Sequence, residues 1–149
     1  MSLQEKVMES LKAAMKAKDT TALESLRAIK SAILLQQSEA GASELSGADE
    51  IKLLQKLVKQ RKDSADLYQS QGRADLAEPE LAQAAIIEQF LPEPLSDSAL
   101  ITLIDTVIKD LSASGMKDMG KVVSEVTARA QGGAEGKTIA QKVKEKLSQ

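Results

Sequence analysis

The sequence predicts a soluble, almost entirely α-helical protein, and three observations support this fold class. Hydrophobic residues make up 42% of the 149 residues but aromatic residues only 1%, so the core must consist mainly of aliphatic side chains. Such a composition favours helix–helix packing over a β-sandwich. Apolar residues recur every three or four positions along most of the chain, as on one face of a helix. No segment reads convincingly as a strand, and no repeat of fixed period is present.

The first two helices are expected to begin at capping boxes, in which a hydroxyl and a carboxylate satisfy free backbone N–H groups. Ser2 and Glu5 form the first box, and apolar residues follow it at helical spacing. After a polar break, Thr21 and Glu24 form the second box, and this helix should end near Gly41.

A long third helix and a shorter fourth helix complete the first part of the chain. The loop 41–47 is rich in Gly, Ser and Ala, and Ser46 or Asp49 then caps the third helix. Gly72 is its expected end, because glycine accepts the left-handed conformation. The fourth helix is expected over about residues 75–90. Its inward-facing side chains are predicted to be Leu76, Ala84, Ile87 and Leu91.

The segment Pro92-Glu93-Pro94 predicts a domain boundary, because two prolines stop a helix and favour an extended link. We therefore expect an N-terminal domain, residues 1–92, built as a long-helix bundle or as helical hairpins. A C-terminal domain, residues 95–149, should contain three helices. About 55 residues is marginal for independent stability.

Within that C-terminal domain, Ser96 caps the first helix and Gly115 is expected to end it. The next helix should run from about Asp118 to the Gly132-Gly133 pair, and the last should bury Ile139, Val143 and Leu147. The first of these helices has the strongest amphipathic pattern. Its predicted stripe consists of Leu100, Ile101, Ile104, Val107, Ile108 and Leu111.

The composition excludes several classes of function. The chain contains no cysteine and no histidine, which rules out disulfides, thiol nucleophiles, a Ser-His-Asp triad and any zinc site that needs these ligands. We therefore expect no catalytic residues, no metal and no cofactor. Charge begins in the first residues and no run approaches 18 apolar residues, so we expect no signal peptide, no membrane span and a cytoplasmic location.

The segment 132–138, GGAEGKT, ends like a phosphate-binding loop. Gln131 stands where that motif needs its first glycine, however, and a helix rather than a strand is expected before it. The favoured interpretation is a glycine stop followed by a helix start. A weaker functional interpretation is that free N–H groups at this start, with Lys137, hold one phosphate of a larger ligand.

Positive charge is concentrated on the third helix, although the net charge of the chain is -2. Steps of four and three residues place Lys52, Lys56 and Lys59 on one face, with Arg61 and Lys62 adjacent. Such a row can bind a phosphate backbone, where neutralisation of charge drives affinity. An ordinary solvated helix face is the favoured alternative.

Two other cations, Arg27 and Lys30, lie in a helix that is otherwise apolar or small. We expect them to pair with carboxylates across the bundle and thus to have a structural role.

Several segments together resemble the YqeY family. Members of this family are all-helical, with a longer-helix N-terminal part and a three-helix C-terminal part, so the resemblance implies the architecture expected above. The segments cover nearly the whole chain, and they are residues 23–33, 53–68, 72–78, 90–104 and 119–147.

The C-terminal part of the family is similar to the tail domain of the B subunit of the tRNA-dependent amidotransferase, which helps engage tRNA. The catalytic regions of that enzyme have no counterpart here. Two positions depart from the family pattern: Gly133 stands where many relatives carry a charged residue, and Pro79 interrupts a helix start usually rich in Glu and Lys. The first departure removes a possible phosphate contact. The tail motif itself carries over as Met119, Gly120, Lys121, Arg129, Gly136 and Lys137.

Three functions follow, in order of preference. The first is a non-catalytic adaptor that associates with tRNA or another RNA. The second is a docking module for an amidotransferase subunit, a translation factor or another protein. The third, implied by the family resemblance alone, is a carbon–nitrogen ligase with glutamine as amide donor. The candidate RNA-binding residues are Lys52, Lys56, Lys59, Arg61, Lys62, Lys121, Arg129 and Lys137.

Overall fold

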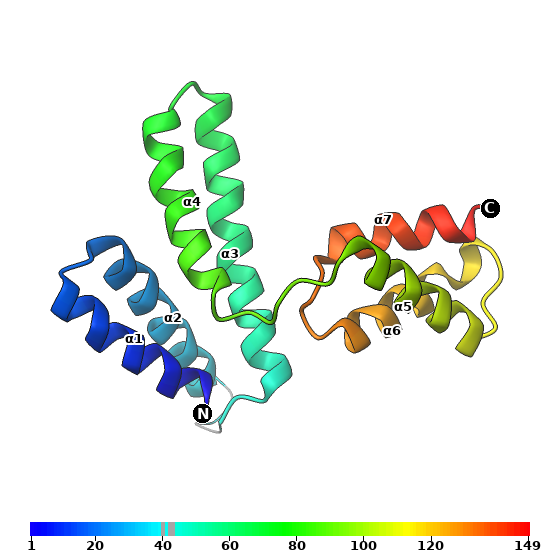
Figure 1. Ribbon diagram of the computed structural model, residues 1–149, viewed down its shortest axis with the longest axis horizontal. Helices are drawn as coiled ribbons and strands as arrows, with labels where there is room; N and C mark the ends of the chain where they lie inside the picture. The colour runs from blue at the N-terminus through cyan, green and yellow to red at the C-terminus, as the bar shows by residue number, and fades with distance from the viewer. Residues whose placement is uncertain (40, 42–43) are drawn as a thin grey trace. The chain divides into compact units, whose positions relative to one another are not determined.

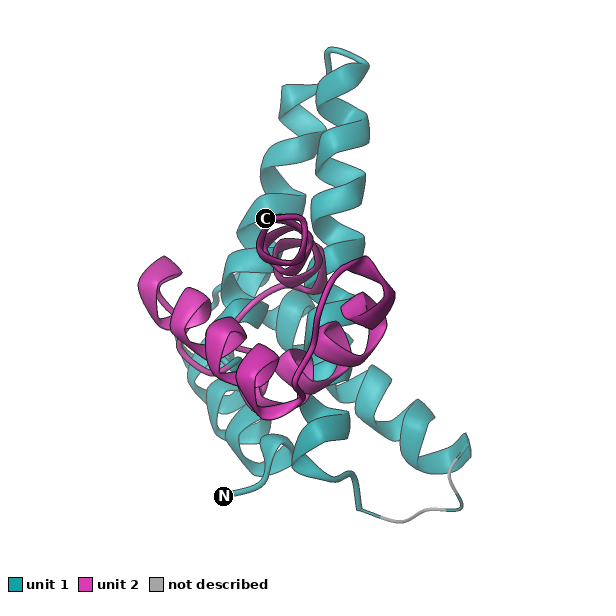
Figure 2. Cartoon of the chain, turned by 90° about the vertical axis from the view of Figure 1, so that its right-hand side faces the viewer, with its two compact units in different colours: residues 1–91 teal, residues 92–149 magenta. Residues whose placement is uncertain are grey.

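The computed structural model describes residues 1–39, 41 and 44–149, and these residues form only helices and the segments that connect them. The predicted all-α fold is therefore confirmed. Two compact units divide the chain at residues 1–91 and 92–149 (Figure 2). None of the described helices is long and apolar enough to cross a membrane. The elements are α1 (Leu3–Ala17), α2 (Thr20–Glu39), α3 (Gly47–Ser70), α4 (Ala74–Glu88), α5 (Asp97–Asp110), the 3-10 helix η1 (Met116–Asp118), α6 (Met119–Ala130) and α7 (Gly136–Leu147).

Three helix starts lie where the sequence predicts them. The hydroxyl groups of Ser2, Ser46 and Ser96 each accept a hydrogen bond from the backbone N–H three residues later, at 3.1–3.2 Å. Each serine thus satisfies one of the free donors of the first turn of α1, α3 or α5. Residues 42 and 43 of the predicted loop 41–47 lie outside the described residues.

The predicted capping box at Thr21 is wrong. α2 begins at Thr20, and the carboxylate of Asp19 accepts the hydrogen bond from the Ala22 N–H at 3.1 Å. α1 ends at Ala17, and its C-cap residue Lys18 has a left-handed φ of 56°, so this turn brings Asp19 to the cap position of α2. The tight turn at Lys18 therefore places Asp19, and not Thr21, at the start of α2.

The predicted end of α5 at Gly115 is also wrong. Ser112 has a φ of 50°, and the Ala113 N–H donates to the Ile108 carbonyl at 3.0 Å, so the helix closes before the glycine is reached. Gly115 instead has a φ of 78° at the entry to η1. α6 ends beside the predicted glycine pair, although Gln131 rather than a glycine takes the first left-handed position.

The N-terminal unit contains two antiparallel hairpins, α1–α2 and α3–α4, and α4 packs against both α2 and α3 (Figure 1). The predicted inward orientation of Leu76 is wrong, since 37% of this residue is exposed while Ala77 is buried. α4 is apolar on most of its circumference, so its pattern does not define a single inward face. The buried cluster consists of Leu3, Val7, Leu11, Ala14, Leu26, Ile29, Ile33, Leu53, Leu54, Val58, Ala84 and Ile87.

The C-terminal unit packs α5, α6 and α7 around a second aliphatic core, as predicted for a three-helix unit. Ile101 was expected in this core, but it is 36% exposed because the buried face of α5 passes through Leu100 and Ile104. The core consists of Leu100, Ile104, Val107, Val122, Val126, Ala130, Ile139, Val143 and Leu147.

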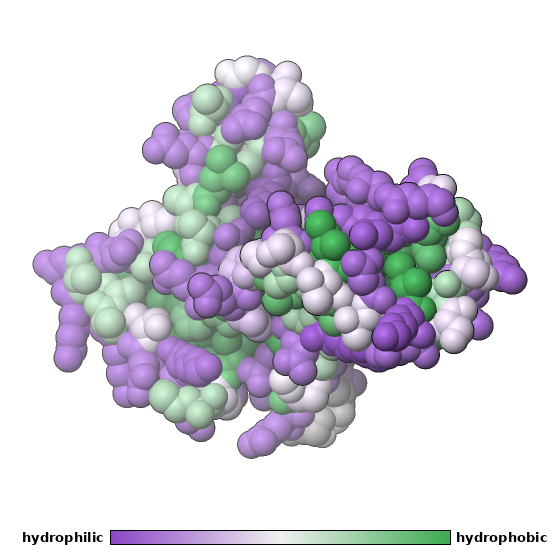
Figure 3. All heavy atoms as spheres, turned by 45° about the vertical axis from the view of Figure 1, so that its right-hand side comes forward, coloured by the Kyte–Doolittle hydropathy of each residue, from purple (hydrophilic) through white to green (hydrophobic). Residues whose placement is uncertain are grey.

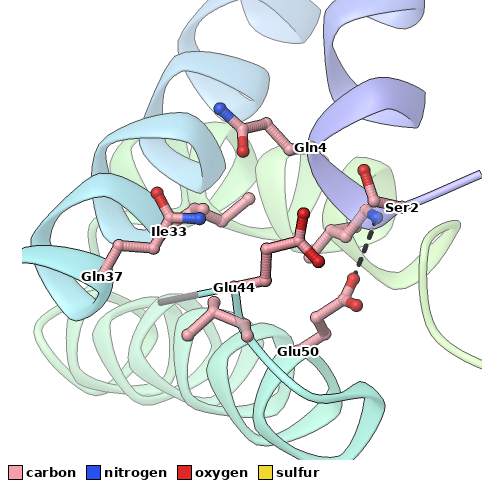
Figure 4. A pocket seen from close by; sticks show the side chains of 8 residues that line it. Ser2, Gln4, Ile33, Gln37, Glu44 and Glu50 are labelled. Carbon is pink, nitrogen blue, oxygen red and sulfur yellow. Dashed lines mark hydrogen bonds between the residues drawn. The ribbon is translucent and has the colours of Figure 1, made fainter. Parts of the chain in front are cut away.

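A long-range hydrogen bond ties the start of α1 to α3. The carboxylate of Glu50 accepts from the backbone N–H of Leu3 at 2.9 Å, across 47 positions of sequence (Figure 4). Together with the Ser2 cap, it satisfies a second free donor of the first turn of α1. The bond borders a small hollow, on whose rim Gln4 of α1 and Gln37 of α2 also lie.

Candidate nucleic-acid interface

The basic residues of α3 do not share one environment. Lys52 and Lys56 are exposed, one turn apart, and within the described part of the chain neither forms an ion pair. Lys59 is also exposed, but its ammonium lies 2.7 Å from the Asp63 carboxylate. The hydrogen bond from this ammonium, and then the charge of Asp63, raise the pKa of Lys59 above its usual value. Of the three lysines in the row, Lys52 and Lys56 are therefore the two whose ammonium groups are available to an external anion.

Arg61 and Lys62 turn toward α4. The guanidinium of Arg61 donates to the Gln83 side chain and to the Leu57 carbonyl, each at 3.1 Å. The ammonium of Lys62 lies 2.9 Å from the Glu88 carboxylate. Both cations are half-buried, so the geometry assigns them to holding the α3–α4 hairpin together. Sequence spacing placed both cations next to the lysine row, but it could not predict that Gln83 and Glu88 of α4 contact them.

In the C-terminal unit, the three candidate cations also differ. The guanidinium of Arg129 bridges Asp110 at 2.8 Å and Glu125 at 2.9 Å, and these hydrogen bonds, that to Asp110 most strongly, raise its pKa. Lys121 on α6 and Lys137 on α7 are exposed, and neither is in an ion pair among the residues that the structure describes. Arg129 is therefore a link between α5 and α6.

Residues 131–135 connect α6 to α7 and residues 136–138 begin α7, so the segment is a glycine stop followed by a helix start, as the favoured interpretation expects, and not a strand–loop–helix unit. Glu135 occupies the N-cap position of α7, which puts an acidic residue beside the free N–H groups and disfavours an anion there. Gly133 is buried, and a Cβ atom built on it would lie 2.8 Å from the Leu95 side chain. A side chain larger than that of glycine at this position would therefore have to displace the Leu95 side chain.

The predicted pairing of Arg27 and Lys30 across the bundle is wrong. Arg27 is exposed and Lys30 half-buried, and neither forms an ion pair with any described residue. The nearby carboxylate of Glu24 accepts instead from the Gln83 amide at 3.1 Å, on the side of α2 that faces α4. The sequence alone gave no signal that these two cations are left without partners.

No group of three or more carboxylates suited to a metal ion occurs in the described ranges, which lack residues 40, 42 and 43. On the face drawn in Figure 3, exposed hydrophobic residues form areas separated by hydrophilic side chains. The described residues thus define a class of protein, all-helical and built of two compact units.

Within this class, the chain belongs to the YqeY-like family. The sequence profile of that family, described as Yqey-like protein, matches residues 4–147. The membership predicted from the sequence segments is therefore confirmed.

Two curated relatives are both named altered inheritance of mitochondria protein 41, mitochondrial. The protein from Clavispora lusitaniae is 42% identical over 84 residues, which are 54% of this chain and 46% of the relative. The protein from Meyerozyma guilliermondii is 37% identical over 92 residues, 61% of this chain and 48% of the relative. The chain thus spans about half the length of the curated relatives it matches.

Proposed function

We propose that this protein is a non-catalytic helical adaptor that associates with tRNA through exposed lysines. The observation that carries the proposal is the pair Lys52 and Lys56, exposed on one face of α3 with no ion pair among the described residues. A cation without an intramolecular carboxylate exchanges only solvent and counterions for a phosphate, so it gives up no existing contact on binding. Lys121 and Lys137 provide the same chemistry on the C-terminal unit.

The resemblance of the C-terminal unit to the tail of the amidotransferase B subunit supports tRNA as the kind of RNA. The lack of histidine and cysteine removes the imidazole base and the thiol nucleophile, which is in keeping with an adaptor.

The experiment is a titration of the protein into labelled total tRNA at 50 and 200 mM salt. We expect binding that weakens steeply with salt, and we expect Lys52→Glu/Lys56→Glu to weaken it further. Loss of two phosphate contacts should reduce the slope of log K against log salt by about 1.4–1.8. Lys62→Glu is a poor probe, because it places a second carboxylate next to Glu88.

A matched control is Lys12→Glu/Lys16→Glu, which makes the same change of charge on α1, away from α3. Equal loss of tRNA affinity in both double variants would mean that total charge, and not the α3 surface, determines binding. Absence of binding at 50 mM salt would contradict the proposal.

The alternative of a carbon–nitrogen ligase with glutamine as amide donor is separable from the adaptor. It requires glutamine hydrolysis in the presence of charged tRNA. Ammonia release above the background of heat-denatured protein would favour it and would displace the non-catalytic adaptor.

A further inference from the structure

The lysine row of α3 ends in an ion pair. Lys52, Lys56 and Lys59 recur at steps of four and three residues, so they share one face of the helix. These steps correspond to about 6 Å and about 4.5 Å along the helix axis. One turn beyond the row, the Asp63 carboxylate accepts a 2.7 Å hydrogen bond from the Lys59 ammonium. Asp63 therefore neutralises the third lysine of the row.

The pair of Lys59 and Asp63 lies in solvent. The two side chains are 76% and 61% exposed, and no other described residue forms an ion pair with either of them. Ion pairs at this spacing on an exposed helix face contribute little to stability, and salt screens them. An external anion can therefore displace the Asp63 carboxylate without loss of the fold. The Lys59 ammonium stays charged when the pair opens, because lysine is protonated at neutral pH.

We propose that Lys59 is a third phosphate contact of the α3 row, and that the Asp63 carboxylate occupies its ammonium until tRNA binds. This inference rests on the tRNA-binding function proposed above and adds a residue that limits the affinity of the same surface. Carboxylate and phosphate oxygens both accept hydrogen bonds from an ammonium group. In the free protein, Asp63 thus takes the position at Lys59 that a phosphate oxygen takes in the complex.

The carboxylate of Asp63 opposes binding in two ways. A phosphate that reaches Lys59 must first break the ion pair, and the released carboxylate then repels the neighbouring phosphates. Asp66, the next acidic residue of α3, is exposed and forms no ion pair with any residue that the structure describes. Asp66 therefore contributes repulsion alone. A comparison of the two aspartates separates competition for Lys59 from the effect of total charge.

The test is a titration of the full chain into labelled total tRNA at 50 and 200 mM salt, with the variants Asp63→Asn and Asp66→Asn. Each variant removes one negative charge from an exposed position of α3, and the two positions are three residues apart. At 50 mM salt, we expect Asp63→Asn to bind tRNA about two- to fivefold more tightly than Asp66→Asn, the range for an exposed ion pair.

The dependence on salt provides a second readout. In the original chain, Lys59 exchanges one anion for another on binding, and the freed Asp63 carboxylate collects a counterion of its own. In Asp63→Asn, Lys59 instead releases a counterion, as Lys52 and Lys56 do. The slope of log K against log salt should therefore be steeper by about 0.7–0.9, the contribution of one phosphate contact. Asp66→Asn should leave the slope unchanged.

Removal of the Lys59 ammonium tests whether Asp63 acts through it. In a Lys59→Met background, Asp63→Asn should gain no more affinity than Asp66→Asn, because no ammonium is left to release. Lys59→Met alone should weaken binding less than Lys56→Met, because Lys59 gives up an existing ion pair on binding and Lys56 does not. Thermal unfolding of all variants should stay close to that of the original chain, since every changed side chain is exposed.

Equal gains in Asp63→Asn and Asp66→Asn would overturn the inference and leave the tRNA-binding function in place. A gain in Asp63→Asn that persists in the Lys59→Met background would also overturn it. Absence of tRNA binding by the original chain at 50 mM salt would contradict the proposed function. In that case, binding by Asp63→Asn that Lys59→Met abolishes would still support the blocked contact, and no binding by Asp63→Asn would overturn the inference as well.

Discussion

The two units use their cations in different ways. In the C-terminal unit, Arg129 joins α6 to α5, and two lysines of α7, Lys142 and Lys146, reach carboxylates of α5 at 4.0 and 3.2 Å. In the N-terminal unit, Lys62 joins α3 to α4, but the cations of α1 and α2 pair with no described residue. A cation that holds helices together is not available to a partner, so the available cations of the first unit lie on α1, α2 and α3, and those of the second include Lys121 and Lys137.

Each unit has its own buried aliphatic core. Truncation of a core residue should therefore produce the largest loss of stability, and this loss should be confined to one unit. Ile29 and Ile104 are both fully buried, one in each cluster. We expect Ile29→Ala and Ile104→Ala each to cost about 2–5 kcal/mol of unfolding free energy, from lost burial and a residual cavity.

Hydrogen exchange measured residue by residue should locate these losses. Ile29→Ala should lower protection in α1–α4, and Ile104→Ala in α5–α7. Equal loss of protection throughout the chain in both variants would show one cooperative unit.

A second prediction concerns the turn before α7. Gly133→Ala places a methyl group 2.8 Å from the Leu95 side chain and 3.0 Å from the Ala130 carbonyl. The structure must shift to relieve these contacts, which we expect to cost about 1–3 kcal/mol. Thermal unfolding measures the loss, and Gly136→Ala, at a position with open space, is the control. Equal melting temperatures for the two variants would contradict the crowding.

A third, smaller loss of stability is expected when the hydrogen bond from the Leu3 N–H to Glu50 is removed. Glu50→Ala leaves the Leu3 N–H without its acceptor, and we expect a cost of about 1 kcal/mol in urea unfolding, as for other helix caps. Glu50→Gln keeps an acceptor oxygen and should lose less. Glu44→Ala is the nearby control, because Glu44 is exposed on the rim of the same hollow. A loss in Glu44→Ala as large as in Glu50→Ala would assign the effect to local charge.

The smallest effect tests the comparison of cations directly. Lys62→Met removes the ion pair with Glu88, which is partly exposed, and should cost less than about 1 kcal/mol. Lys30→Met removes a cation without a carboxylate partner and should leave unfolding free energy unchanged or raise it. Urea denaturation of the two variants at low salt measures the difference. The opposite order would mean that Lys30 contributes to folding and is not kept for a partner.

The sequence predicted the helices well but predicted the environment of the charges poorly. Helix starts could be predicted at Ser2, Ser46 and Ser96 because a helix cap depends only on residues within three positions of it. Arg61 is different, since its partner Gln83 lies 22 positions away on another helix. Helical spacing tells which residues share a face, and it does not tell what packs against that face.

Exposed apolar residues show the same limit. Leu76 and Ile101 both fit a helical stripe, yet each lies just outside the side that a neighbouring helix covers. Where a helix is apolar on more than one flank, several orientations satisfy the pattern, and only tertiary packing selects among them. The candidate RNA-binding residues remain a prediction, which the binding experiments above address.

The contact between Gly133 and Leu95 also has a consequence for how the sequence can vary. The Leu95 N–H donates to the Gly133 carbonyl at 2.7 Å, and the Leu95 side chain fills the space of a missing Cβ. The two positions are therefore coupled, and a substitution at one changes the cost of a substitution at the other. Leu95→Ala should act as a partial suppressor of Gly133→Ala, because it removes one of the two crowded contacts and leaves that with the Ala130 carbonyl.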